Sequence, residues 1–264
     1  MARRRLDAEL VHRGLARSRE QARELVGAGR VALNGVVAAK PATQVEATAS
    51  LVVRPGQDGP DYVSRGAHKL VGALDAFDLE VAGRHALDAG ASTGGFSDVL
   101  LRRDVAAVVA VDVGYGQLAW PIRSDHRVTV LERTNIRALT PEALPFRPDL
   151  VVGDLSFISL ALVLPPLVLV GTPGVDLVLM VKPQFEVGKE QVGAGGVVRD
   201  PALRSAAVRK IADAAWGLGL GCAGVVASPL PGPSGNVEYF LHLRRGEPPL
   251  DDTELTRAIE DGPQ

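Results

Sequence analysis

The sequence predicts an α/β protein in which a mostly parallel, doubly wound sheet of seven strands follows a small α+β domain. Over residues 66–243, short aliphatic runs alternate with stretches of helical periodicity, which is typical of parallel strands joined by covering helices. Residues 3–53 show a different order, with two helices followed by short strands. The segment Arg54–Asp61, RPGQDGPD, separates the two patterns with turn-forming residues.

The small domain, expected over residues 1–58, is predicted from capping and turn signals. Ser18 precedes a helical run and can cap it, because its hydroxyl can accept a backbone N–H of the first turn. Asn34 and Gly35 stand between two valine-containing runs, a pattern typical of a tight hairpin turn. Leu51–Val53 is expected to form a last strand.

The second domain, expected over residues 62–246, is predicted to hold the seven-stranded sheet. Parallel strands covered on both faces are continuous apolar runs, and the candidate strands are Ala86–Ala89, Val105–Val111, Val128–Leu131, Leu150–Gly153, Leu177–Val181, Cys222–Ala227 and Val237–Leu243. A helix is expected before them, from Gly66 to Leu79. Residues 247–264 are expected to form a tail with a short, weakly held helix.

Charge is divided unevenly between the two parts of the chain. Residues 1–54 carry ten arginines or lysines and five acids, whereas the remainder carries 19 and 26. A basic domain on an acidic body favours a polyanionic partner for the basic part. On charge alone, a solvated charged face explains the same residues equally well.

Two features bear on the compartment. Cys222 is the only cysteine, so no disulfide can form within the chain and a reducing, cytoplasmic location is expected. The uncharged stretch Leu155–Val175 has the length of a membrane span, but prolines and glycines interrupt it and no basic cluster flanks it. We interpret it as a buried helix that leads to a buried strand, and we expect no membrane as the primary partner.

A glycine-rich turn follows the first strand of the second domain, at the end of a sheet where ligands bind. The dinucleotide fingerprint needs glycine at its first, third and sixth positions, but the third position counted from Gly90 is Ser92. The pattern therefore disfavours a nicotinamide-linked dehydrogenase and suits a nucleoside cofactor without a pyrophosphate. The turn residues expected to contact such a cofactor are Gly90, Ala91, Ser92, Thr93, Gly94 and Phe96.

Two residues beyond the next strands could complete this cofactor site. Asp112 follows the second strand, about twenty residues on, and an acid there can accept hydrogen bonds from both ribose hydroxyls of an adenosine. Asn135, beyond the third strand, could contact the adenine edge. For both residues, a turn or capping role is the alternative.

Four charged residues can converge at the same edge of the sheet. Asp154 and Lys182 end two neighbouring strands, and Glu238 begins the last strand. If that strand is antiparallel, its start lies beside the ends of the other two. Lys69, on the preceding helix, can join them.

Residues 3–53 resemble the small RNA-binding domain first described in a ribosomal small-subunit protein. The resemblance is carried by Arg17-Ser18-Arg19, Ala22, Gly29-Arg30-Val31, Leu33, Asn34-Gly35 and Lys40-Pro41. In such domains basic residues of the second helix contact phosphates, which position a protein without reading sequence. Ion pairs on a surface helix are the alternative explanation. The residues expected to bind RNA are Arg4, Arg17, Arg19, Arg30, Lys40 and Arg65.

Nearly the whole chain resembles the TlyA family, also called hemolysin A-like. The matching motifs are 63–70 (VSRGAHKL), 88–96 (DAGASTGGF), 112–118 (DVGYGQL), 154–159 (DLSFIS), 181–186 (VKPQFE) and 234–239 (SGNVEY). The resemblance implies a Rossmann-like class I, FtsJ-like methyltransferase domain that uses S-adenosylmethionine. It also implies 2′-O-methylation of cytidine in rRNA of the small and/or large ribosomal subunit, and it leaves open whether free rRNA, a subunit or the whole ribosome is the substrate. The family's Lys-Asp-Lys-Glu tetrad falls on Lys69, Asp154, Lys182 and Glu238.

The tetrad suits this chemistry, because a ribose 2′-hydroxyl is a very weak acid that must lose its proton as the methyl group is transferred. A lysine whose pKa is lowered by burial beside a second lysine can act as the base. The acids can hold the ammonium groups, and Lys69 can stabilise the developing alkoxide. No metal is required, and no His/Cys ligand cluster is visible.

Three points stay open at this stage. Residues 184–201 are long, polar and glycine-rich, and we interpret them as a mobile loop that closes over cofactor or RNA. A non-catalytic RNA-binding assembly factor and a membrane-lytic hemolysin remain alternative functions. The sequence does not indicate an oligomeric state.

Overall fold

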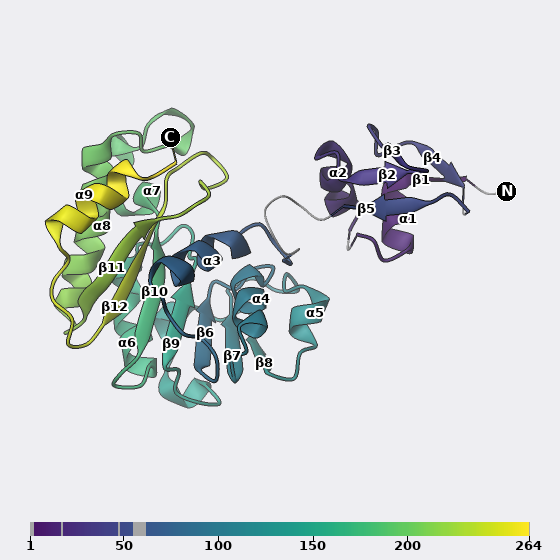
Figure 1. Ribbon diagram of the computed structural model, residues 1–264. Helices are drawn as coiled ribbons and strands as arrows, with labels where there is room; N and C mark the ends of the chain where they lie inside the picture. The colour runs from purple at the N-terminus through teal and green to yellow at the C-terminus, as the bar shows by residue number, and fades with distance from the viewer. Residues whose placement is uncertain (1–2, 17, 47, 55–61, 264) are drawn as a thin grey trace. The chain divides into compact units, whose positions relative to one another are not determined.

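The chain divides into two compact units, residues 1–61 and 62–264 (Figure 1). The structure, a computed structural model, describes residues 3–16, 18–46, 48–54 and 62–263.

The N-terminal unit packs two helices against short antiparallel strands. Strand β1 (Arg3–Arg5) pairs with β4 (Gln44–Glu46), and β2 (Val31–Leu33) pairs with both β3 (Val36–Val37) and β5 (Leu51–Val53). Helices α1 (Leu6–His12) and α2 (Arg19–Gly27) bury Leu6, Leu10, Ala22 and Val26 against them.

Both local predictions for this unit are confirmed. Ser18 caps α2, because its Oγ accepts the backbone N–H of Gln21 at 3.1 Å. Asn34 and Gly35 join β2 to β3 with φ of 49° and 84°. These left-handed conformations are the ones that an Asn-Gly turn supplies at low cost.

The second unit contains the predicted seven-stranded sheet, in the order β11-β12-β10-β9-β6-β7-β8. Five parallel strands, β6 (His85–Ala89), β7 (Ala107–Val111), β8 (Val128–Leu131), β9 (Leu150–Gly153) and β10 (Asp176–Val181), form its centre and one edge. Strand β12 (Tyr239–Arg244) runs antiparallel to both β10 and β11 (Gly221–Ala227). The antiparallel last strand, on which the predicted convergence of the four charged residues depended, is therefore present.

Helices cover both faces of the sheet, which confirms the doubly wound fold (Figure 1). One face packs against α3 (Ala67–Ala76), α4 (Gly95–Arg102) and α5 (Trp120–Arg123), and the other against α6 (Leu164–Val170), α8 (Pro201–Trp216) and α9 (Asp252–Glu260). Short turns of helix complete the unit: α7 (Pro183–Glu186), η1 (Ile136–Ala138), η2 (Pro141–Ala143), η3 (Leu160–Leu162), η4 (Lys189–Gln191) and η5 (Ala194–Gly196).

The expectation of a weakly held helix in residues 247–264 is wrong, whereas the buried helix expected in residues 155–175 is confirmed. The segment expected as a tail contains α9, which buries Leu255, Ala258 and Ile259 in the core formed with α6 and α8. The stretch 155–175 contains η3 and α6, whose Leu164 and Leu167 are fully buried. Among the described residues, no helix is both long and apolar enough to cross a membrane.

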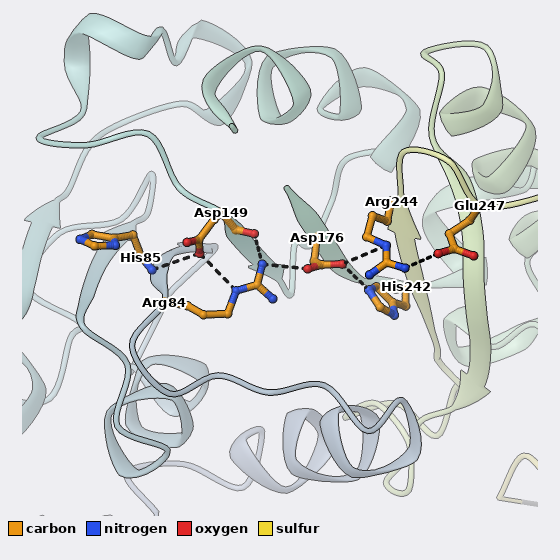
Figure 2. Close-up of polar contacts among 7 residues, drawn as sticks. All are labelled: Arg84, His85, Asp149, Asp176, His242, Arg244 and Glu247. Carbon is orange, nitrogen blue, oxygen red and sulfur yellow. Dashed lines mark hydrogen bonds and ion pairs between the residues drawn. The ribbon is translucent and has the colours of Figure 1, made fainter. Parts of the chain in front are cut away.

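An ion-pair network ties the sheet together at the edge where the parallel strands begin (Figure 2). The Arg84 guanidinium lies 3.2 Å from Asp149 Oδ1 and 2.8 Å from Asp176 Oδ2, and His242 Nε2 lies 2.8 Å from Asp176 Oδ1. Burial favours a higher pKa for the Asp176 carboxyl, but its hydrogen bonds with His242 and Arg84 hold the pKa below the usual value. The network links the segments of β6, β9, β10 and β12. It does not involve the opposite edge of the sheet, where the parallel strands end.

Candidate active site

The structure brings the four predicted charged residues together at the carboxyl edge of the parallel strands. Asp154 directly follows β9, Lys182 directly follows β10, and Glu238 directly precedes the antiparallel β12. The last residue of β10, Val181, pairs with Tyr239, so Lys182 and Glu238 leave adjacent strands at the same level. Lys69 reaches this edge from the first turn of α3.

One lysine–carboxylate pair is almost completely buried. Lys69 Nζ lies 2.5 Å from Glu238 Oε2, and the exposed fractions of the two residues are 8% and 1%. Glu238 Oε1 is buried without a hydrogen-bond partner among the described residues. The turn before β12 approaches it closely, since a Cβ on Gly232 would lie 2.5 Å from that oxygen. A buried acceptor without a partner is unusual in a folded protein and calls for an explanation.

The second pair includes a residue that the sequence did not reveal. Lys182 Nζ lies 2.5 Å from Asp154 Oδ1 and donates a hydrogen bond to Ser156 Oγ at 2.9 Å. Lys182 itself is 8% exposed. Ser156 belongs to a turn without periodicity, so only the folded structure shows its contact with the lysine.

The glycine-rich turn lies against this second pair. Gly90 has φ of 85°, and Gly94, the N-cap of α4, has φ of 97°. A Cβ on Gly90 would lie 2.8 Å from the carbonyl oxygen of Asp154. Ser92 and Thr93 are exposed on the turn, whereas the Phe96 side chain packs in the core against Phe240.

Acidic side chains surround the turn. Asp88, at the end of β6, is 1% exposed, and burial raises the pKa of its carboxyl to about 7. Its Oδ2 accepts hydrogen bonds from Ser97 N and Ser97 Oγ, at 3.0 Å and 2.7 Å. Its Oδ1 is buried and has no hydrogen-bond partner among the described residues. Asp88 was part of the motif identified in the sequence, but it was not predicted as a site residue.

The two other cofactor residues already hold backbone groups. Asp112 accepts the N–H of Ser92 at 2.8 Å and that of Gly114 at 2.6 Å, one on each carboxylate oxygen. These bonds fix the orientation of the carboxylate and leave lone pairs for a ligand. Asn135 is exposed and caps η1 by accepting Arg137 N at 3.0 Å. Its capping role is present, and its contact with adenine stays a prediction.

The loop after Lys182 is fastened to the segment that carries Glu238. Asn236, 2% exposed, accepts Val198 N at 2.9 Å and donates to Gly196 O at 2.8 Å. Gly195 and Gly196 both have positive φ there, 76° and 78°. The loop therefore has a defined conformation, and its closure over ligands stays a prediction.

In the N-terminal unit, two buried acids gather the basic residues. Asp7 forms ion pairs with Arg5, Arg19 and Arg23 at 3.0, 3.1 and 3.5 Å, and Glu9 pairs with Arg4 and Arg13 at 3.4 and 2.8 Å. Hydrogen bonds from Arg5 and Arg19 hold the pKa of the Asp7 carboxyl well below its usual range. The two buried carboxylates therefore hold these arginines in place.

The remaining predicted RNA-binding residues lie in different settings. Arg30 Nε donates to Arg54 O at 3.0 Å, and Lys40 is exposed. Arg65 is exposed just before α3, in the second unit. Arg17 lies outside the described residues.

Comparisons with known proteins agree with this division. The sequence profile of FtsJ-like methyltransferases matches residues 62–245, and that of the S4 domain matches residues 4–51. The TlyA protein of Mycobacterium tuberculosis, named a 16S/23S rRNA (cytidine-2′-O)-methyltransferase, is 62% identical over 270 residues, with 100% of both chains covered. The chain belongs to the TlyA family of FtsJ-like methyltransferases.

Other members of the TlyA family carry a different name. Hemolysin A of Brachyspira hyodysenteriae is 35% identical over 245 residues, which cover 90% of this chain and 99% of its own. A solved structure of a candidate hemolysin from Streptococcus thermophilus is 37% identical and superposes with a TM-score of 0.77, covering 98% of this chain and 95% of the other. Family and fold predictions are both confirmed, and the chain is a methyltransferase.

Proposed function

We propose that the protein transfers a methyl group from S-adenosylmethionine to the ribose 2′-hydroxyl of a cytidine in ribosomal RNA. The observation that carries the proposal is the meeting of two lysine–carboxylate pairs beside the glycine-rich turn. Membership of the TlyA family supports the substrate, since the M. tuberculosis relative is named for cytidine 2′-O-methylation of 16S and 23S rRNA.

The residues around the turn fit the cofactor. S-adenosylmethionine, when bound, supplies a methyl group that is activated by the positive charge of its sulfonium. Gly90 leaves open the space that a side chain would fill, and Asp88 Oδ1 is a buried acceptor without a partner. Asp88, Asp112 and Asp154 place acidic groups around the turn, and these favour a cationic ligand. Gly90–Gly94, Asp88 and Asp112 would hold the cofactor.

Lys182 acts as the base in this account. As the ammonium partner of Asp154, the lysine must lose a proton to solvent before it can accept one. The neutral Nζ would then take the proton of the 2′-hydroxyl while the ribose oxygen bonds to the methyl carbon, and the electron pair of the broken carbon–sulfur bond would remain on a neutral thioether as the leaving group. Asp154 holds the lysine before and after this transfer.

Lys69 and Glu238 stabilise the charge that develops on the ribose oxygen. Lys69 Nζ is a buried cation fixed by Glu238, and a preorganised cation in a site of low dielectric lowers the energy of a developing alkoxide. Only one of the two Glu238 oxygens is occupied by the lysine. The second oxygen can accept a hydrogen bond from the substrate ribose.

The N-terminal S4 domain supplies affinity for RNA. Arg4, Arg19, Arg30 and Lys40 carry positive charge on one small unit, and contacts to phosphates position a protein without reading the sequence. A target nucleotide within folded rRNA must leave its stack to reach the tetrad, at a cost of a few kcal/mol. The proposed substrate places the activity in the cytoplasm, where ribosomes are.

The test is the chemical identity of the product. Ribosomal subunits from cells that lack the enzyme are incubated with the protein and methyl-labelled S-adenosylmethionine, and the rRNA is digested to nucleosides. Label in 2′-O-methylcytidine supports the proposal. Tight cofactor binding without transfer to either subunit supports an assembly factor instead, and cofactor-independent release of dye from lipid vesicles supports lysis.

A further inference from the structure

The ammonium group of Lys182 has two partners on one loop. Its Nζ lies 2.5 Å from Asp154 Oδ1 and 2.9 Å from Ser156 Oγ. Both residues belong to the segment that follows β9, whereas Lys182 follows the neighbouring strand β10. Asp154 supplies the negative charge that balances the ammonium group. Ser156 carries no charge, so its contact with the lysine needs another explanation.

The geometry of an amine supplies that explanation. A neutral lysine Nζ has two hydrogens and one lone pair in a tetrahedral arrangement, and it can rotate about its Cε–Nζ bond. When the amine stays in contact with Asp154 and donates one hydrogen to Ser156, its rotation is restricted and the lone pair points in one direction. With the Asp154 contact alone, more than one orientation of the lone pair is open.

Ser156 is held in place by contacts on the far side of its loop. Ser159 Oγ donates to Glu186 Oε2 at 2.5 Å, and Leu160 N donates to Glu186 Oε1 at 2.7 Å. Glu186 is 6% exposed and ends α7, the short helix that begins after Lys182. The two segments that carry the lysine and the serine are therefore joined a second time.

A residue with a strained backbone lies between the Lys182–Ser156 contact and the contacts with Glu186. Phe157 has φ of 63°, and its ring packs against Phe185 with the centroids 5.2 Å apart. A left-handed conformation is unfavourable for an aromatic residue, and such strain persists where the surroundings over-determine the backbone. The turn that presents Ser156 to Lys182 is maintained at this cost.

We propose that Ser156 is a positioning residue that aims the lone pair of Lys182 at the ribose 2′-hydroxyl. The proposal rests on the function proposed above and deepens it. Ser156 is exposed in the free protein, so water can replace its hydroxyl there. Bound RNA excludes that water, so the serine acts on the rate of methyl transfer within the complex and not on cofactor affinity.

The test compares three variants in single-turnover methyl transfer at saturating RNA and cofactor, over roughly pH 6 to 9. Ser156→Ala removes the hydroxyl, and Ser156→Thr keeps it. Ser159→Ala makes the same change three residues along, at a contact with Glu186 and not with the lysine. Thermal denaturation and the Kd for S-adenosylmethionine are measured for each variant.

We expect Ser156→Ala to lower the maximal rate about tenfold, the value of one well-placed hydrogen bond, with an unchanged cofactor Kd. The midpoint of its pH–rate profile should move to lower pH, because the ammonium form loses an acceptor. Ser156→Thr should restore both the rate and the profile. Ser159→Ala keeps the bond from Leu160 N to Glu186, which still holds the loop, so it should lower the denaturation temperature without moving the profile.

Two results overturn the inference. One is a Ser156→Ala rate within twofold of wild type with the same pH profile, and the other is a Ser156→Thr variant as slow as Ser156→Ala. Either result with an active wild type leaves the proposed function standing. A wild type that transfers no methyl group to RNA removes the proposed function itself, and the inference with it.

Discussion

The carbonyl oxygen of Asp154 and the backbone of Gly90 are in direct contact, so that a Cβ on residue 90 would lie 2.8 Å from that oxygen. The contact joins the turn expected to hold the cofactor to the strand end that carries a tetrad carboxylate. In the proposed function, one backbone junction therefore positions both the cofactor turn and the carboxylate that pairs with the base, and a change on one side of it should disturb both.

Gly90→Ala tests this junction. The added methyl group must displace Asp154, and φ of 85° is unfavourable for alanine, so we expect cofactor affinity to fall at least tenfold and methyl transfer to be lost. Gly83→Ala is the matched control, with φ of 73° and nothing within 4 Å of its Cβ. It should cost about 1 kcal/mol of stability and leave cofactor binding intact. Equal cofactor Kd values for the two variants, measured by equilibrium dialysis, would contradict the account.

Asp88 predicts a pH dependence of cofactor binding. With its pKa raised to about 7 by burial, the carboxyl is mostly neutral below that pH and charged above it. A cationic ligand prefers the charged form, so affinity for S-adenosylmethionine should rise several-fold between about pH 6 and about pH 7.5. In Asp88→Asn the affinity should be lower and nearly constant over this range. A wild-type Kd that is independent of pH would refute the role of Asp88.

The same carboxyl has an effect of opposite sign on the stability of the ligand-free protein. Its folded pKa lies above the unfolded value of about 3.9, so the folded state holds the proton more tightly. The stability contributed by the protonated group is therefore lost as the pH rises from about 4 to about 7. Urea unfolding of wild type and Asp88→Asn at both ends of this range checks the sign.

The buried Lys69–Glu238 pair predicts a large cost for removing one partner. Glu238→Gln leaves the Lys69 ammonium buried without a counter-charge, and we expect the free energy of unfolding to fall by about 3 kcal/mol. Glu247→Gln, which breaks a partly exposed pair with Arg244, should cost less than about 1 kcal/mol. Both tryptophans, Trp120 and Trp216, lie in the second unit, so their fluorescence during urea unfolding reports on it. Similar losses in the two variants would show that the tetrad pair is not specially buried.

Lys40 predicts a change in the salt dependence of RNA binding. If this exposed lysine contacts a phosphate, Lys40→Ala should lower the slope of log K against log salt by about 0.7–0.9. Arg209→Ala, on α8 of the other unit, should leave the slope unchanged. Titrations of an rRNA fragment at several salt concentrations give both values. A Lys40→Ala slope equal to wild type would exclude a phosphate contact at this position.

The sequence revealed the sheet because buried parallel strands are continuous apolar runs, and Leu150–Gly153 and Asp176–Val181 are buried throughout. It did not reveal β1 and β4, because Arg3–Arg5 is polar and Gln44–Glu46 contains one apolar residue, Val45, and the two strands are defined by their pairing with each other. Strands of three residues are too short to show a hydrophobic period.

The tetrad could be predicted for a related reason. Once the strands are assigned, the residues that follow neighbouring parallel strands must lie at the same edge of the sheet, however far apart they are in the sequence. Ser156 and the unpartnered oxygen of Asp88 could not be predicted. The serine contact depends on the left-handed backbone at Phe157, and the burial of Asp88 depends on packing against Ser97 of α4. Neither leaves a periodic signal in the sequence.

The most direct test of the account is methyl transfer by Lys182→Ala under single-turnover conditions, with labelled S-adenosylmethionine and ribosomal subunits that lack the modification. Because the lysine acts only as base, the variant should bind cofactor and RNA as wild type does and transfer label at least about 100-fold more slowly. A Lys182→Ala variant that forms 2′-O-methylcytidine within a few-fold of the wild-type rate would contradict the central role given to this lysine.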